Sequence, residues 1–262
     1  IRLERANTVL PKGTIVTVRI DGTGLPSVFS PDPINWIYSK PQPASQGTFN
    51  LNNNGEQIFF MSGGNVGGPN ATIAASDGGT YTGNFLFGFN TKGNVWTPVC
   101  GNVNAGGTQN SDKPINLDCF LTWPTAQADL NKYSGLMTPT TKRDWIERIN
   151  NPSNWTGYVD NATYEAGPNF YGQSITINAG GFTDGIWIGS SSNNWFECGN
   201  WQSLKVPDEN MNVILDSNSV QKVNIDSTAP FSDLYADIAK CRNLSVSNFS
   251  VELLSDINNV LY

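Results

Sequence analysis

The last third of the chain places three tryptophans, Trp187, Trp195 and Trp201, within a short segment rich in Gly, Ser and Asn. Indole rings are large, and in so turn-rich a segment only the surface of a sheet offers enough area to pack them. Residues 241–246, CRNLSV, then carry apolar side chains at alternate positions, as a strand does. This part of the chain therefore predicts a β unit with the tryptophans in its core.

Composition supports a β-rich chain and disfavours some classes of binding partner. The 262 residues are enough for one large or two medium domains. Only 14% of them are charged, against about 25% in an average soluble protein, which is typical of short strands and many turns. The formal net charge of -7 disfavours nucleic acid and anionic membranes as partners. No apolar run reaches the roughly 18 residues of a membrane span.

Apolar runs predict strands throughout the chain. In the first half they cover residues 2–10 and 12–20, joined at Pro11, and a pair at 47–51 and 56–61 around an Asn-Gly turn. A buried strand at 84–89 and a short strand at 174–177 follow. Further strands are expected at residues 212–215, 220–225, 244–246 and 251–254.

One helix is expected, over residues 142–150. Thr141 is a suitable N-cap, and Asp144 completes a capping box with it. Trp145, Ile146 and Ile149 fall on one face, and Pro152 ends the helix.

Several segments resemble known families. The runs LPKGTIVTV, FNLNNNGEQIFFM and NFLFGFN resemble the lamin-tail family of Ig-like β-sandwiches. The run TKRDWIERINNPSNW is similar to a segment that accompanies lamin-tail-like sandwiches in secreted Bacteroidota proteins. The last third is similar to a repeat of secreted and cell-surface proteins of Bacteroidota, W-x-G…W…NW…VP…C-x-NL-x-V, whose proteins usually leave the cell by the type 9 secretion route.

These resemblances imply an all-β chain of two domains. Residues 1–181 would form a lamin-tail-like sandwich with one short helix. The family's opening strands, expected before Leu3, either precede residue 1 in a longer polypeptide or are replaced by another segment. Residues 182–262 would form a second small β domain, either a sandwich or the start of a β-solenoid, cut at its C-terminal end. Both ends of the chain are thus expected to be internal to a longer polypeptide. The implied location is extracellular, on the bacterial cell surface, with the type 9 secretion machinery as partner during export.

The chain has four cysteines and no histidine. This excludes most zinc sites, Ser-His-Asp triads and Cys-His dyads. Disulfides are the leading use, and the simplest of three connectivities pairs neighbours in sequence: Cys100 with Cys119, and Cys198 with Cys241. Such bridges would contribute about 3 to 4 kcal/mol each. Four buried free thiols are the alternative.

No residue pattern names a reaction. Six carboxylates are candidates for acid and base chemistry, and none stands in a catalytic spacing: Asp77, Asp112, Asp118, Glu165, Asp184 and Glu197. No cofactor is predicted. Calcium is the best candidate metal, at residues 21–24, 77–80 and 216–218, but Asx-turns explain the same residues and are favoured.

Four aromatic residues lie in loop-like surroundings and are candidates for contact with sugars or proteins: Trp36, Tyr38, Trp96 and Trp123. Anchoring of their own loops is the default interpretation. For Trp145, Trp155 and the three tryptophans of the last third, core packing is favoured.

The sequence thus favours a non-enzymatic, exported structural or adhesion module of the cell surface, part of a larger type 9 cargo protein. Surface glycans or other surface proteins are its expected partners. Alternatively, the chain is an accessory or carbohydrate-binding region of a secreted hydrolase whose catalytic domain lies elsewhere. An enzyme acting through two carboxylates within these residues is the weakest hypothesis.

Overall fold

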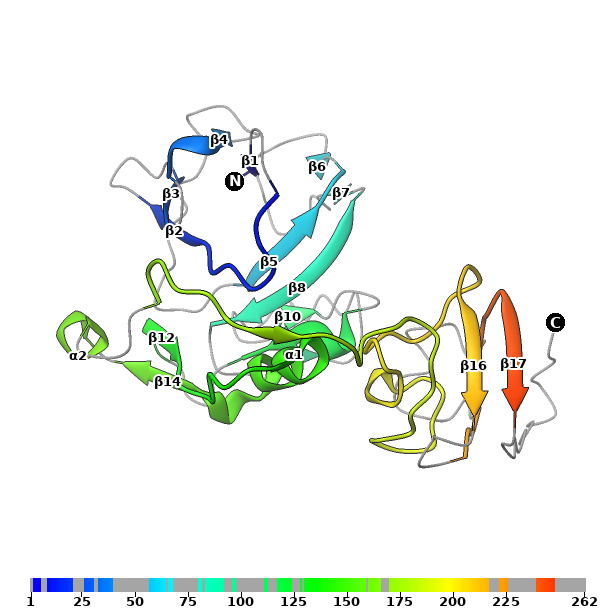
Figure 1. Ribbon diagram of the computed structural model, residues 1–262. Helices are drawn as coiled ribbons and strands as arrows, with labels where there is room; N and C mark the ends of the chain where they lie inside the picture. The colour runs from blue at the N-terminus through cyan, green and yellow to red at the C-terminus, as the bar shows by residue number, and fades with distance from the viewer. Residues whose placement is uncertain are drawn as a thin grey trace.

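The computed structural model of the protein is built mostly of short strands, with two α-helices among the residues it describes (Figure 1). Those residues are 2–5, 9–20, 26–30, 33–39, 57–64, 66–67, 80–81, 83–91, 96–97, 111–112, 117–123, 128, 130–158, 160–165, 170–216, 222–225 and 239–247. This agrees with the all-β prediction, while the lamin-tail sandwich stays a prediction. The domain boundary after residue 181 also stays a prediction. The described residues before it, 2–181, are called the sheet unit, and those after it, 182–247, the coil unit.

Most described strands of the sheet unit pair antiparallel. The antiparallel pairs are β1 (Arg2–Arg5) with β4 (Trp36–Ser39), β2 (Thr17–Ile20) with β3 (Pro26–Ser30), β5 (Gln57–Ser62) with β8 (Asn84–Asn90), β6 (Val66–Gly67) with β7 (Thr80–Tyr81), and β12 (Leu130–Tyr133) with β14 (Trp155–Tyr158). The parallel pairs are β8 with β11 (Leu121–Thr122), β9 (Trp96–Thr97) with β10 (Ser111–Asp112), and β13 (Thr140–Thr141) with β15 (Ile177–Asn178).

The sheet β11-β8-β5 carries an apolar face. Phe59 of β5 and Phe85 of β8 meet edge to face, with ring centroids 5.5 Å apart. Both pack against a buried cluster that includes Leu117, Phe120 and Leu121, from the 3-10 turn η2 (Asp118–Phe120) and β11. The predicted strand at 84–89 is therefore confirmed, and the alternation of its side chains places the core on one side of the sheet.

Helix α1 (Lys142–Asn150) has the predicted bounds. The Thr141 hydroxyl accepts a hydrogen bond from the Asp144 backbone N–H at 3.2 Å, which is the predicted N-cap. Trp145 is 3% exposed, and its indole N–H donates to the Thr176 carbonyl at 2.9 Å. The helix ends before a 3-10 turn, η3 (Pro152–Asn154), as Pro152 requires. A second helix, α2 (Asn161–Glu165), was not predicted.

The predicted strand over residues 12–20 is too long, because only Thr17–Ile20 is a strand. Upstream, the Thr14 backbone N–H donates to the Pro11 carbonyl at 3.1 Å and closes a turn. Ile175 N–H then donates to the Gly13 carbonyl at 2.8 Å, so this segment bonds to residues 173–175 instead of extending β2. A side chain at Gly13 would collide with the Ile175 carbonyl oxygen. The other early prediction, residues 2–10, is a strand only over Arg2–Arg5 among its described residues.

Predicted strands elsewhere have mixed outcomes. Residues 47–51 and 251–254 lie outside the described residues. Of the predicted strand 220–225, residues 222–225 are described, and they contribute a bridge at Asn224. Residues 174–177 form a bridge at Ser174 and the start of β15.

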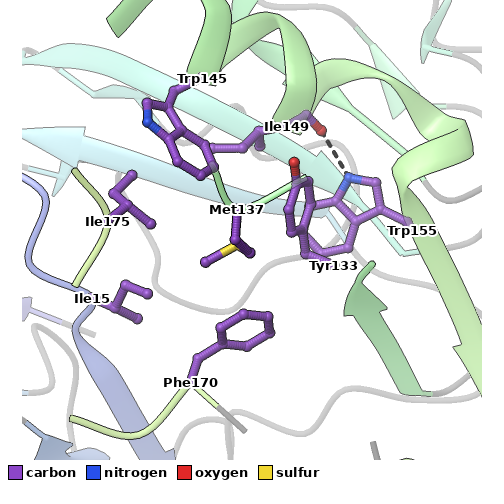
Figure 2. Close-up of a pocket in the computed structure, with 8 residues that line it drawn as sticks. All are labelled: Ile15, Tyr133, Met137, Trp145, Ile149, Trp155, Phe170 and Ile175. Atoms are coloured by element: carbon purple, nitrogen blue, oxygen red, sulfur yellow. Dashed lines mark hydrogen bonds between the residues drawn. The ribbon is translucent and has the colours of Figure 1, made fainter. Parts of the chain in front are cut away.

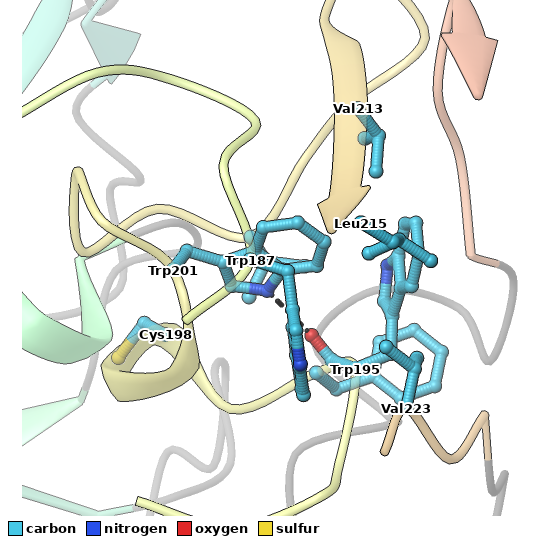
Figure 3. Close-up of a cluster of buried hydrophobic side chains, with 9 residues drawn as sticks. Trp187, Trp195, Cys198, Trp201, Val213, Leu215 and Val223 are labelled. Atoms are coloured by element: carbon cyan, nitrogen blue, oxygen red, sulfur yellow. Dashed lines mark hydrogen bonds between the residues drawn. The ribbon is translucent and has the colours of Figure 1, made fainter. Parts of the chain in front are cut away.

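The coil unit is centred on the three predicted tryptophans (Figure 3). Trp187, Trp195 and Trp201 are 1%, 3% and 0% exposed. Their rings meet edge to face, with the Trp201 centroid 5.0 Å from that of Trp187 and 4.8 Å from that of Trp195. The Trp201 indole N–H donates to the Trp195 carbonyl at 2.8 Å, so its polar atom is satisfied inside the core. The prediction that these tryptophans form a core is confirmed.

Successive passes of the coil unit run parallel. β16 (Asn212–Asp216) pairs with β17 (Asn243–Ser247), and the two arrows point the same way in Figure 1. Two isolated parallel bridges, Ile186 with Ile214 and Asn194 with Asn224, join the preceding pass to the same stack. The paired positions are about 30 residues apart, the length of one turn in a stacked repeat. Val213 and Leu215 of β16 point into the tryptophan core, each 1% exposed.

Candidate functional site

A disulfide joins the two units, and it is not one of the predicted pairs. Cys119 of η2 is bonded to Cys198 of η4 (Cys198–Asn200), with Cα atoms 5.9 Å apart. The predicted pairing of Cys119 with Cys100, and of Cys198 with Cys241, is therefore wrong. The fold brings η2 and η4 together although the two cysteines are 79 positions apart in sequence. Proximity in sequence was therefore a wrong guide to the pairing.

Of the other two cysteines, the structure describes one. Cys100 lies outside the described residues. Cys241 has a free thiol that is partly buried against the tryptophan core. Burial raises the pKa of this thiol, because the thiolate would lose its hydration there.

Beside the disulfide, Arg143 of α1 forms hydrogen bonds with backbone carbonyls of the coil unit. Its guanidinium donates to the carbonyls of Trp201 at 2.5 Å and Gly199 at 2.8 Å. It also forms an ion pair with Glu147 at 2.7 Å, on the next turn of the same helix. The planar fork of an arginine suits this role, because it donates to several carbonyls at once while its charge stays paired. No sequence pattern marked Arg143, which looks like an ordinary surface residue of a helix.

Leu204 completes the junction from the coil unit. It is 2% exposed and packs into the sheet-unit cluster of Leu117, Phe120 and Leu121. Its φ of 59° lies in the left-handed region, which a leucine seldom adopts and which needs support from its surroundings. The junction therefore combines a covalent bond, charged hydrogen bonds and a shared apolar cluster.

The turn that presents these carbonyls is fixed by Asn200, which is fully buried. Its side-chain oxygen accepts from the backbone N–H groups of Ser191 at 2.9 Å and Ser192 at 2.8 Å. Its amide nitrogen donates to the Ser192 hydroxyl at 2.9 Å and to the Asn194 carbonyl at 2.8 Å. All four hydrogen-bonding positions of this amide are thus used inside the protein.

The sheet unit contains an apolar pocket of about 190 Å³ (Figure 2). Four aromatic rings line it: Tyr133, Trp145, Trp155 and Phe170. Four aliphatic or thioether side chains complete the described lining: Ile15, Met137, Ile149 and Ile175. These residues come from the segment before β2, from β12, from the turn after it, from α1, from β14 and from the segment leading into β15.

The polar atoms on the pocket-lining rings are bonded to backbone carbonyls. The Trp145 indole donates to Thr176, and the Trp155 indole donates to Ile149 at 2.8 Å. The Tyr133 hydroxyl donates to the Leu136 carbonyl at 3.3 Å, and burial raises the pKa of this phenol although Arg148 opposes the shift. Among the described lining, the pocket therefore presents carbon and sulfur, with no charged side chain.

None of the four predicted ligand-contact aromatics is among the described residues that line this pocket. Trp36 and Tyr38 both belong to β4. Trp96 belongs to β9, and the side chains of Tyr38 and Trp96 are outside the described part of the chain. Trp123 packs against the cluster of Leu117, Phe120 and Leu121. The sugar-binding interpretation stays a prediction, and for Trp123 the observed contact is packing.

Of the six candidate carboxylates, the structure describes the side chains of Asp184 and Glu197, and these two do not form a pair. Asp184 is exposed, and Glu197 accepts a hydrogen bond from the Ser192 hydroxyl at 3.2 Å. Asp77 lies outside the described residues, as do the side chains of Asp112, Asp118 and Glu165. No cluster of three or more metal-binding side chains occurs in the described part of the chain. Of the calcium loops, only Asp216 and part of the 77–80 loop, Thr80, are described. None of the described helices is long and apolar enough to cross a membrane.

Comparison with known proteins found no family model, no curated protein and no solved structure that matches this chain.

Proposed function

We propose that this protein is a non-enzymatic, exported module with a structural or adhesive role on the bacterial cell surface. The observation that carries the proposal is the junction between the two units. A disulfide, the Arg143 hydrogen bonds and the buried Leu204 side chain all cross from the sheet unit to the coil unit. A module that transmits load between its ends needs such a connection, whereas a flexible tether between independent domains does not.

The disulfide also supports export. Structural disulfides persist in oxidising compartments and are rare in the reducing cytosol. The bridge lies beside two buried clusters, with Cys198 8% exposed, which is the setting of a structural bond. The resemblance to secreted Bacteroidota proteins adds the route to the proposal: the type 9 machinery as export partner, and surface glycans or surface proteins as binding partners.

The proposal includes a β-solenoid for the coil unit. Ig-like sandwiches are built from antiparallel strands, whereas β16, β17 and two isolated bridges are parallel at intervals of about 30 residues. Parallel stacking at a constant interval supports the solenoid alternative. The sheet unit, with its mainly antiparallel pairs, remains compatible with the lamin-tail-like sandwich.

An adhesion assay under flow tests the role. Beads coated with the protein are passed over surfaces of bacterial surface glycans and over whole cells, and retention is measured as shear rises. We expect retention that survives high shear for the native protein and for Cys241→Ala, and that fails at lower shear for the double variant C119A/C198A. Turnover of polysaccharide by the isolated chain contradicts the proposal, and absence of retention on every surface contradicts its adhesive alternative.

The export route is tested separately. The chain is produced with its natural flanking sequence in a Bacteroidota host, with and without a working type 9 translocon. Labelling of intact cells by antibody is expected only when the translocon works. Retention of the protein in the cytosol in both strains contradicts an exported role.

A further inference from the structure

The apolar pocket of the sheet unit has a composition and size that the structural role does not require. Its volume of about 190 Å³ exceeds the roughly 150 Å³ of a cavity that stays dry and binds benzene. The pocket is open on one side, and its apolar lining lacks the dispersion contacts and the burial that a guest would supply. From this pocket we infer a binding site for a small, uncharged apolar molecule of about the size of one substituted ring.

The lining selects the class of ligand. The indole N–H groups of Trp145 and Trp155 donate to Thr176 and Ile149, and the Tyr133 hydroxyl donates to Leu136. The three donors of these rings are therefore used within the protein, and the Tyr133 oxygen is the one polar atom of the rings that keeps accepting capacity. A charged or strongly polar molecule would thus lose most of its hydration without replacement. An aromatic or branched aliphatic guest would instead bury its surface against rings on several sides.

Met137 gives the pocket a route to solvent. It is 38% exposed, and its thioether points into the pocket in Figure 2. A methionine is unbranched and adapts its shape, so it can move aside for a guest and close over it. The next residue, Leu136, is 67% exposed and is not part of the described lining. These neighbours provide a matched pair of variants.

The test is thermal unfolding of the protein with toluene, with benzoate as a charged molecule of similar shape. At ten times the dissociation constant, toluene should raise the Tm by about 3 °C, and benzoate should not. Met137→Trp should fill the mouth and abolish the toluene shift, whereas Leu136→Trp should keep it. An unchanged Tm of the native protein at saturating toluene overturns the inference, as does an equal shift with benzoate.

A second measurement does not depend on a variant. In NMR spectra of the native protein, bound toluene should give nuclear Overhauser effects to the Met137 methyl group and the Trp155 ring. Effects confined to exposed residues such as Leu136 overturn the assignment of the pocket. An increase in Tm by Met137→Trp, together with no binding of toluene to the native protein, also overturns it, because the pocket would then be only a packing defect.

Discussion

Removal of the Cys119–Cys198 bridge should cost more stability than removal of a sequence-local bridge. The two cysteines are 79 residues apart in sequence. In the chain-entropy model a loop of that length restricts the unfolded chain by about 4.5 kcal/mol, compared with about 3 kcal/mol for the predicted Cys100–Cys119 pair. The double variant C119A/C198A should therefore lose about 4.5 kcal/mol in its free energy of unfolding.

The assay is equilibrium unfolding in guanidinium chloride, followed by tryptophan fluorescence and by circular dichroism. Cys241→Ala is the control, because it removes a thiol of the same size without removing a cross-link, and it should change stability by less than about 1 kcal/mol. In the double variant the unfolding curves should separate into two transitions, because Trp187, Trp195 and Trp201 of the coil unit can then unfold apart from the sheet unit, which holds the other five of the eight tryptophans. A loss below about 1.5 kcal/mol with coincident transitions would refute the reasoning.

Three further predictions concern the junction and the helix beside it. Arg143→Ala should lower the free energy of unfolding by about 3 kcal/mol in denaturant titration, since the carbonyls of Gly199 and Trp201 lose a charged donor; the exposed Lys205→Ala should be nearly neutral, and equal losses would contradict the clamp. Asn200→Asp keeps the shape of the side chain but removes the two hydrogen bonds that its amide nitrogen donates. The free energy of unfolding should therefore fall by about 2 kcal/mol, seen as a Tm several degrees lower. An unchanged Tm would show that the turn does not need these two hydrogen bonds. The hydrogen bond from the Thr140 hydroxyl, ahead of those from Thr141, lowers the pKa of Asp144, so its stabilising effect is complete above the unfolded pKa and disappears as the pH falls through the folded one. Stability measured from pH 5 to pH 2 should accordingly decline less in Asp144→Asn, and parallel curves would contradict this role.

Local signals predicted local structure well. Helix α1 was predicted with its bounds because Thr141, Asp144 and Pro152 act within a few residues of each other. The tryptophan core was predicted because Trp187, Trp195 and Trp201 are close in sequence and too large to leave unpacked. Strand 12–20 was overestimated, since the turn at Pro11 and the bonds of Gly13 to Ile175 depend on a distant segment.

Features that depend on contacts between distant segments could not be predicted from the sequence. The partner of Cys119 is set by how η2 and η4 meet, and four cysteines carry no information about that. The pocket is assembled from residues as far apart as Ile15, Tyr133 and Phe170, with no periodicity to connect them. Trp155, assigned to the core, instead lines this pocket while it contacts Phe89 at a centroid distance of 4.8 Å.

Single-molecule extension tests the load-bearing junction most directly. When the oxidised protein is pulled by its ends, the loop closed by Cys119 and Cys198, which are 79 positions apart in sequence, should stay locked, and reduction should release about 280 Å of additional contour length. We predict that increment, together with a lower unfolding force for the coil unit after reduction. The same contour length and force in both redox states would contradict a covalently closed junction between the two units.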